Sequence, residues 1–200
     1  MAVEAPLAGL VLAGGRSTRM QRDKATLDFG GETQLARAVR LVRAHAPDTF
    51  VSVRADQREE AERARWPQIV DRLADVGPAA GILAALEARP DCAWLVVAVD
   101  LPLLDAATLG RLVALRDASA PATAYRSAGD GLPEPLCAIW EPGSRAEIAE
   151  FIAAGRNCPR KFLLSHAAKL IDLIAPDALV NVNTPADLEA ARTRAGGATQ

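Results

Sequence analysis

The 200-residue sequence lacks the side-chain combinations on which several classes of protein depend. It has three cysteines, no C-x-x-C pair and only two histidines, which argues against a structural zinc site. Three cysteines that lie far apart in the sequence are typical of a reducing cytosol. Lysine and arginine together number 23 against 25 aspartates and glutamates, so there is no basic excess of the kind that a general nucleic-acid-binding protein shows.

Long apolar stretches are missing as well. No run approaches the ~20 residues that are needed to cross a bilayer. The N-terminus carries Glu4 and no basic segment of the kind that opens a signal peptide. From these absences we expect a cytoplasmic protein that binds neither a membrane nor nucleic acid.

What the sequence does have is an alternation of short apolar runs with segments whose apolar residues recur at helical spacing. We expect strands at 7–13, 50–53, 69–70, 93–99, 122–125, 136–140, 170–174 and 179–182. We expect helices at 34–44, 56–64, 81–88, 105–116, 144–154, 159–165 and from 184 onward. This order predicts a three-layer α/β fold with a mostly parallel central sheet, in one domain over residues 1–195, followed by a disordered tail at 196–200.

A basic loop with two glycines, LAGGRSTRMQRDK (12–24), follows the first predicted strand. In open α/β sheets ligands bind at the carboxyl ends of the strands, so this loop lies at the expected ligand edge. Gly14 and Gly15 leave backbone N–H groups open to an anion, and Arg19 and Lys24 add positive charge. The loop is neither a Walker A motif nor a G-x-G-x-x-G motif. The pattern favours a phosphate-binding loop, with a solvated basic turn as the alternative.

Asp100 is a second candidate, because it directly follows the most apolar predicted strand, 93–99. A carboxylate at that position faces the ligand edge of the sheet. Mg²⁺ usually takes one or two protein carboxylates together with phosphate oxygens of a substrate, and Asp100 suits that role. The alternative is that Asp100 caps the following turn, although Asp105 is the better N-cap for the next helix.

The segment 12–24 resembles the signature loop of the molybdenum cofactor guanylyltransferases, usually written LAGGxSxRMGxDK. This chain departs from that pattern at Gln21, where the family usually has glycine. Further segments resemble motifs of the same family in the same order: Asp71 with GPAAG (77–81), VAVDLPLL (97–104), PEPLCAIW (133–140) and NVNTPADL (181–188). The resemblance spans nearly the whole chain and implies a Rossmann-like nucleotidyltransferase fold.

The resemblance implies that GMP is transferred from GTP to the terminal phosphate of molybdopterin, with release of pyrophosphate and with Mg²⁺ as cofactor. The implied GTP site draws on several of these motifs and comprises Leu12, Ala13, Gly14, Gly15, Lys24, Arg54, Asp71 and Asp100. The implied catalytic residues are Arg19, Lys24 and Asp100, and the implied metal ligands are Asp100 and Asn183. Arg54 stands where the family often has an asparagine that contacts guanine.

Two of these residues also have a purely structural explanation. Asp71 can open the turn that precedes Gly77. Asn183 stands directly before Thr184 and Pro185, which have the sequence of a helix N-cap and first turn.

Two other functions remain open. A related transferase would use CTP on the same cofactor or act on another small molecule, but the cytidylyl branch resembles LAAG where this chain has Ala13-Gly14-Gly15, which favours GTP. A protein of a different class would bind a nucleotide without catalysis and deliver the cofactor to a partner, and it would not require Arg19, Lys24 and Asp100. Proteins that donate or accept the cofactor are further candidate partners.

Overall fold

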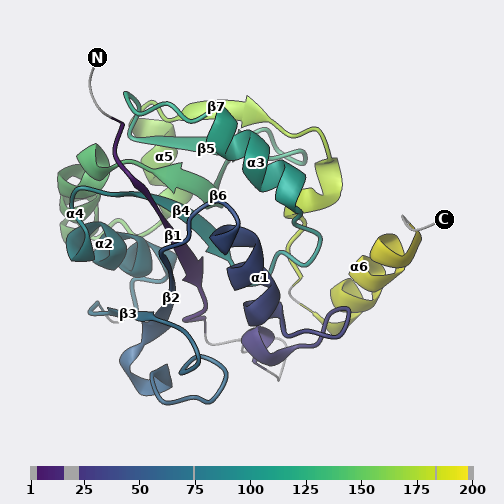
Figure 1. The fold of residues 1–200 in the computed structure, drawn as a ribbon. Coiled ribbons are helices and arrows are strands. Elements are labelled where there is room, and N and C mark those ends of the chain that lie inside the picture. The colour runs from purple at the N-terminus through teal and green to yellow at the C-terminus, as the bar shows by residue number, and fades with distance from the viewer. Residues whose placement is uncertain (1–3, 16–22, 74, 183, 198–200) are drawn as a thin grey trace.

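The computed structural model describes residues 4–15, 23–73, 75–182 and 184–197. A seven-stranded sheet in the order β3-β2-β1-β4-β6-β5-β7 forms its centre (Figure 1). Its strands are β1 (Leu7–Leu12), β2 (Thr49–Arg54), β3 (Gln68–Asp71), β4 (Ala93–Ala98), β5 (Ala122–Arg126), β6 (Pro133–Trp140) and β7 (Lys169–Asp172). All of these run in one direction except β6, which is antiparallel to β4 and β5. The predicted α/β fold with a mostly parallel sheet is confirmed.

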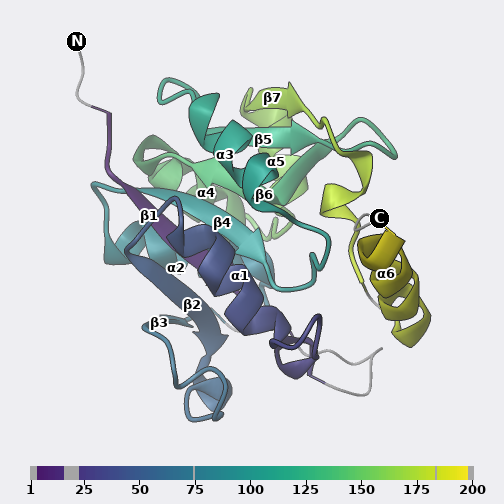
Figure 2. The same ribbon diagram turned by 45° about the vertical axis from the view of Figure 1, so that its right-hand side comes forward.

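Helices cover both faces of this sheet and complete three layers (Figures 1 and 2). The first face carries α1 (Gln34–Arg43) and α3 (Ala106–Ala114). The second face carries α2 (Pro78–Ala88), α4 (Arg145–Ala153) and α5 (Pro159–Ser165). The last helix, α6 (Pro185–Gly197), lies apart from both layers and places Ala191 against Leu27 and Phe29.

The central strand β4 shows why both faces are covered. All six of its residues, AWLVVA, are buried. Side chains alternate between the two faces along a strand, so Leu95 and Val97 pack in the core with α1 and α3, whereas Trp94 and Val96 pack in the core with α2 and α4. A continuous apolar run is typical of a strand enclosed between two helical layers. Because β1 and β4 are parallel neighbours, their carboxyl ends meet at one edge of the sheet.

Most predicted elements are present with their ends shifted by a few residues, but the helix expected at 56–64 is wrong. A 3₁₀ turn, Ala55–Gln57, is followed there by further turns. The Gln57 side chain accepts a hydrogen bond from the backbone N–H of Arg54, which ties the segment to the end of β2. The charged residues do not form a solvated helix face, because Arg63 points inward and is fully buried.

The strand expected at 179–182 is wrong too. A 3₁₀ turn, Pro176–Leu179, occupies its start, and the following residues form no strand. Leu179 and Val182 are apolar because they are buried, and the Val182 backbone N–H donates to the Asp100 carbonyl at 3.0 Å instead of to a sheet partner. A buried loop that contains several apolar residues has the same sequence pattern as a short buried strand.

The predicted start of α6 is confirmed. The Thr184 backbone N–H donates to the Asp187 carboxylate at 2.8 Å, and the Asp187 N–H donates back to the Thr184 hydroxyl at 3.2 Å. This reciprocal pair is a capping box. The helix continues through Gly197, so it includes the first two residues of the segment that was expected to be a tail.

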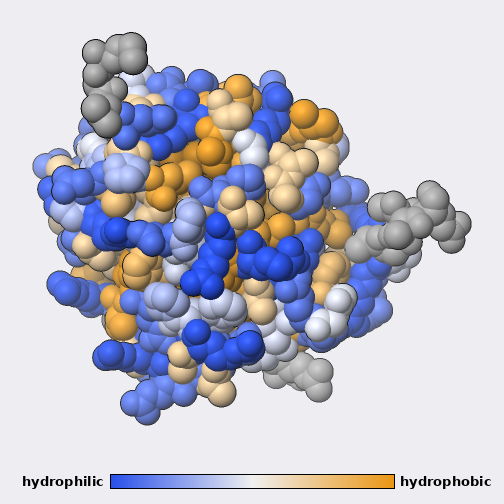
Figure 3. All heavy atoms as spheres, in the orientation of Figure 1, coloured by the Kyte–Doolittle hydropathy of each residue, from blue (hydrophilic) through white to orange (hydrophobic). Residues whose placement is uncertain are grey.

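The outer surface on the side of α1 and α3 is mostly hydrophilic, with smaller apolar areas between the charged residues (Figure 3). Within the described residues, none of the helices combines the length and the hydropathy that a membrane span requires.

Candidate functional site

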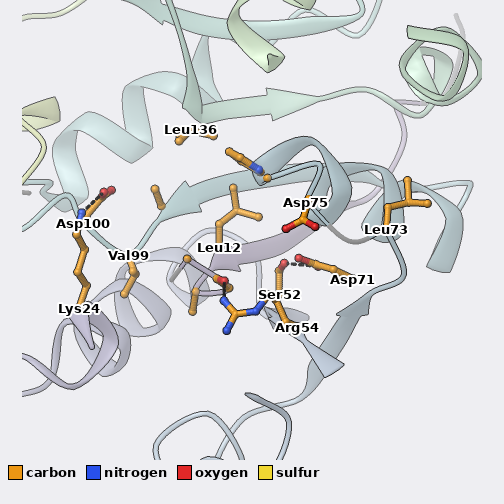
Figure 4. A pocket seen from close by; sticks show the side chains of 16 residues that line it. Leu12, Lys24, Ser52, Arg54, Asp71, Leu73, Asp75, Val99, Asp100 and Leu136 are labelled. Carbon is orange, nitrogen blue, oxygen red and sulfur yellow. Dashed lines mark hydrogen bonds and ion pairs between the residues drawn. The ribbon is translucent and has the colours of Figure 1, made fainter. Parts of the chain in front are cut away.

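A cavity of about 530 Å³ opens at the carboxyl edge of the sheet. Its walls come from the ends of β1, β2, β3 and β4, from the start of α2 and from β6 (Figure 4). All eight residues that the sequence resemblance assigned to a GTP site line this one cavity: Leu12, Ala13, Gly14, Gly15, Lys24, Arg54, Asp71 and Asp100. Two predicted residues, Arg19 and Asn183, lie outside the described residues.

The cavity has two chemically different ends. Figure 4 shows Lys24 and Asp100 at one end and Asp71 and Asp75 at the other, with Leu12 between them. Leu12 and Ala98 are opposite each other in the register of β1 and β4, so the strand ends themselves form the floor between the two ends. This elongated shape suits a ligand that carries charge at one end and a polar ring at the other.

Asp100 is the central group of the first end. Its Oδ2 accepts a hydrogen bond from Lys24 Nζ at 3.0 Å, and the two side chains are 22% and 17% exposed. Its other oxygen, Oδ1, is buried and has no hydrogen-bond partner among the described residues. Buried polar atoms are almost always paired, so this oxygen is available to a ligand. A carboxylate oxygen is the kind of hard donor that Mg²⁺ takes.

The local fold positions both Lys24 and Asp100 at this end of the cavity. Asp100 directly follows β4, and its backbone carbonyl is held by the N–H of Val182. Lys24 begins a 3₁₀ turn, Lys24–Thr26, whose N-cap is Asp23. Asp105 is the N-cap of α3, as expected, and accepts from the Thr108 N–H at 2.7 Å. Among the described residues the Asp100 carboxylate accepts only from Lys24, so the alternative that it caps the following turn is not seen there.

A second group of polar side chains surrounds Asp71. Ser52 Oγ donates to Asp71 Oδ1 at 2.8 Å. Burial raises the pKa of the Asp71 carboxyl, and although the Ser52 hydrogen bond and the charge of Arg54 pull it down, the net shift is upward. A Cβ atom built on Gly14 would lie 3.3 Å from Asp71 Oδ2, so the glycine allows the loop to pass close to this carboxylate.

Arg54 joins the glycine loop to the end of β2. Its Nη1 donates to the Gly14 carbonyl, and its Nε and Nη2 donate to the two carboxylate oxygens of Asp56 at 3.0 and 3.1 Å. The family's usual asparagine could not form this fork. The guanidinium therefore holds the backbone of the loop in place at the edge of the cavity.

The N-terminus of α2 forms another wall. Gly77 is its N-cap with φ = 72°, a left-handed conformation that favours glycine, and Pro78 occupies the first helical position. Further along, a Cβ on Gly81 would lie 2.4 Å from Ser52 Oγ and 2.9 Å from Leu12 Cδ2. Only glycine lets this helix approach the strand ends so closely. The positive end of the helix dipole consequently faces the cavity.

Sequence reasoning missed several lining residues. Ser52 was detectable, because it is a polar residue in a strand and the register of β1 and β2 places it opposite Leu12. Leu73, Asp75 and Leu136 had no signal, since their place in the wall depends on the path of loops and on the direction of β6. Across the described residues there is no group of three or more histidine, cysteine, aspartate or glutamate side chains able to hold a metal ion.

The chain is similar in sequence to known proteins over most of its length. A probable molybdenum cofactor guanylyltransferase of Opitutus terrae is 34% identical over 198 residues, which cover 94% of this chain and 96% of that protein. A molybdenum cofactor biosynthesis bifunctional protein of Synechocystis sp. is 34% identical over 187 residues, which cover 92% of this chain but only 53% of that longer protein.

The fold has counterparts among solved structures. The molybdopterin-guanine dinucleotide biosynthesis protein A of Archaeoglobus fulgidus superposes with a TM-score of 0.72 at 22% identity, covering 95% of this chain and 99% of that one. At the level of sequence families, residues 9–191 match the MobA-like NTP transferase domain. This match covers most of the chain, so the protein belongs to the MobA-like NTP transferase family.

Proposed function

We propose that this protein transfers the guanylyl group of GTP to the terminal phosphate of molybdopterin, releasing pyrophosphate and forming a molybdopterin guanine dinucleotide. The names of the relatives support this reaction. The observation that carries the proposal is the single cavity at the carboxyl ends of β1 and β4. It gathers all eight described residues that the signature motifs assign to GTP.

The polarity of the cavity supports one orientation of the nucleotide. The triphosphate would start at the Lys24 end, where the lysine ammonium is a suitable partner for phosphate oxygens, and extend along the backbone of Gly14 and Gly15, which line the same cavity. The base lies at the end with Asp71 and Asp75, whose carboxylates suit the N–H groups on the edge of guanine. Arg19 is expected to add a bidentate contact to the phosphates.

Asp100 is proposed as the protein ligand of Mg²⁺, with Asn183 as an auxiliary ligand. The buried Asp100 Oδ1, which has no partner in the described part of the chain, fits a cation, and Asn183 follows Val182, which is hydrogen-bonded to the Asp100 carbonyl. When bound, the metal would neutralise charge on the triphosphate and on the departing pyrophosphate. Lys24 donates to the other oxygen of this carboxylate, Oδ2, and thereby restrains the orientation of the Asp100 side chain.

The proposed reaction requires the protein mainly to position the two reacting phosphates and to neutralise their negative charge. An oxygen of the acceptor phosphate forms a bond to the α-phosphorus while the bond from the α-phosphorus to the bridging oxygen breaks. The electron pair leaves with pyrophosphate. Because the nucleophile is already an anion, no general base is needed. Holding the two phosphates in line and compensating their negative charge supply the rate enhancement.

The acceptor would approach from a second cavity, of about 370 Å³, which shares Pro78 and Leu136 with the first. Arg160 lines this cavity and is paired with Asp130 and Glu134. We further propose that the enzyme works in the cytoplasm with proteins that donate or accept the cofactor.

The test is pyrophosphate release from GTP, CTP and ATP, each with and without molybdopterin and over a range of Mg²⁺ concentrations. Release that requires GTP, the acceptor and the metal supports the proposal. Greater release from CTP than from GTP would identify a cytidylyltransferase, and equal release from both would contradict the guanine assignment. Tight GTP binding without any release would identify a non-catalytic binding protein instead.

A further inference from the structure

Arg63 is a fully buried cation next to the candidate site. Its side chain is 1% exposed, although it lies in a turn-rich segment between β2 and β3 that the sequence marks as a charged surface. A buried arginine is costly unless every donor is paired. Its partners therefore show which parts of the molecule it holds together.

The partners of Arg63 stand at the two ends of the glycine loop. Nε and Nη2 donate to the Ala13 carbonyl at 3.1 and 2.7 Å, directly before Gly14. Nη2 also donates to Asp23 Oδ1 at 2.9 Å, and Nη1 donates to Asp23 Oδ2 and to Glu60. All five N–H donors of the guanidinium are thereby used. One planar group thus links residue 13 to residue 23 across the loop.

The electrostatics favour a permanent link. Burial opposes the charged form of Arg63, but the hydrogen bonds and charges of Asp23 and Glu60 outweigh it and raise the pKa of the guanidinium. Burial likewise opposes the charged form of Asp23, but the hydrogen bonds and charge of Arg63 lower the pKa of that carboxyl. Both groups are therefore ionised throughout the neutral range, and the fork is maintained.

Asp23 connects Arg63 to the Lys24 side chain at the cavity. Its Oδ1 also accepts from the Ala25 N–H at 3.1 Å as the N-cap of the turn that begins at Lys24. Lys24 then reaches Asp100 with its ammonium at 3.0 Å. A continuous series of contacts runs from the Ala13 carbonyl through Arg63 and Asp23 to the lysine that faces the cavity.

We propose that Arg63 is a positioning residue for the nucleotide: by fixing Ala13 and Asp23 it holds the adjacent backbone of Gly14 and the Lys24 side chain in the geometry that receives the triphosphate. This inference rests on the proposed function, because it assigns Arg63 to the same site. Arg63 lies behind the loop and need not touch the ligand.

The chain offers a matched control in Arg116. Its side chain is 7% exposed and forms a fork with Glu141 at 2.7 and 2.8 Å, together with one bond to the Ala5 carbonyl at 2.9 Å. It thus has the same chemistry as Arg63: a buried guanidinium, a carboxylate and a backbone carbonyl. Because Ala5 precedes β1 and Glu141 follows β6, this fork lies at the sheet edge opposite the cavity.

The experiment compares Arg63→Lys with Arg116→Lys in the full-length protein. Each variant keeps the charge but loses the planar fork. Thermal unfolding gives the stability loss of each. The GTP dissociation constant is then measured by calorimetry in the presence of Mg²⁺, well below both unfolding transitions, and KM and kcat are measured by pyrophosphate release.

The expected result is that both variants lower Tm, whereas only Arg63→Lys weakens GTP binding, by about 10- to 100-fold, as for the loss of other residues that orient a binding group. KM for GTP should rise with Kd. An unchanged GTP Kd in Arg63→Lys, or an equal rise in Arg116→Lys, would overturn the positioning role. Absence of GTP binding in the unaltered protein would instead defeat the proposed function, and the inference with it.

Asp23→Asn provides a second variant in case Arg63→Lys does not fold. Asp23 is 32% exposed, so its replacement perturbs the core less. It should weaken GTP binding in the same direction. The double variant should lose less than the product of the two single effects, because both act through one link. Fully multiplicative losses would contradict the proposed link.

Discussion

The two oxygens of the Asp100 carboxylate differ: Oδ1 is buried and has no partner among the residues that the structure describes, while Oδ2 accepts from Lys24. We expect Asp100→Asn to abolish transfer and to leave the fold intact, since the amide keeps the shape but loses the charge that a hard cation needs. Pyrophosphate release at several Mg²⁺ concentrations checks this. The control is Asp105→Asn, which exchanges one good N-cap for another at α3 and should change nothing.

Lys24 is the cation expected to face the triphosphate. Lys24→Ala removes a mostly buried ion pair and leaves the Asp100 carboxylate without its cation, so it should lower the unfolding temperature without abolishing the transition. The stabilisation by GTP should largely disappear. Differential scanning calorimetry with and without GTP measures both. Loss of the folding transition in this variant would show that Lys24 is structural.

Asp71 leads to a prediction about pH. Its folded pKa is raised, so between the unfolded and folded pKa values the folded state binds more protons, and the free energy of unfolding falls as pH rises through that window. Asp71→Asn removes this penalty and can still accept the hydrogen bond from Ser52. We expect a higher Tm than wild type at neutral pH, a difference that vanishes in acid, and weaker GTP binding. A Tm gain that persists in acid would point to another cause.

At this scale the residues that the sequence singled out line one cavity because the motifs stand at strand ends. Residues after β1 and β4 must meet when the two strands are parallel neighbours, which is why Gly14 and Asp100 share a cavity. Arg63 was not predictable. Nothing in a run of charged residues indicates which one turns inward, since that depends on where the Ala13 carbonyl and Asp23 come to lie.

Among the elements, α2 depends on a glycine in its interior. A Cβ on Gly81 would meet Ser52 Oγ at 2.4 Å and Leu12 Cδ2 at 2.9 Å, so Gly81→Ala must push the helix away from the strand ends. Alanine favours a helix by about 1 kcal/mol over glycine, yet we expect Gly81→Ala to lower Tm and to weaken GTP binding.

Gly110 in α3 is the matched comparison for that change. There the nearest contact of a Cβ is His45 Cε1 at 3.4 Å, which leaves the substitution nearly free of clashes. Gly110→Ala should leave Tm unchanged or raise it, without any effect on GTP binding. Thermal unfolding of both variants tests this comparison. Equal changes in Tm for the two variants would show that the close approach of α2 to the strand ends does not explain the effect of Gly81→Ala.

The sequence predicted an element well where the interactions that begin the element lie within a few residues of one another. The caps at Asp105 and Thr184 satisfy backbone groups within a few residues, so the sequence contains them completely. The helix expected at 56–64 and the strand expected at 179–182 failed because tertiary contacts decide those segments. Burial of Arg63 and Leu179 depends on parts of the chain far away in sequence.

For the molecule as a whole, ligand binding should be visible as stability. A ligand present at 100 times its Kd adds about 2.7 kcal/mol to the native state, which for a chain of this size corresponds to a Tm increase of roughly 5–10 °C. We expect GTP with Mg²⁺ to produce such a shift and CTP or ATP to produce a smaller one. A shift with CTP that equals or exceeds the GTP shift would contradict the guanine assignment, with Arg54 the first residue to re-examine.

The central place of β1 has a consequence for synthesis of the chain on the ribosome. β1 is the first strand to be made, yet its neighbour β4 begins at Ala93, opposite Leu7 in the register. The glycine loop can be held only after Arg63 has emerged, and Asp100 comes later still. Pairings between distant segments form slowly. On the proposed site, a nascent chain that ends before β4 lacks Asp100 and half of the cavity floor, so GTP is expected to bind only after the first hundred residues have folded.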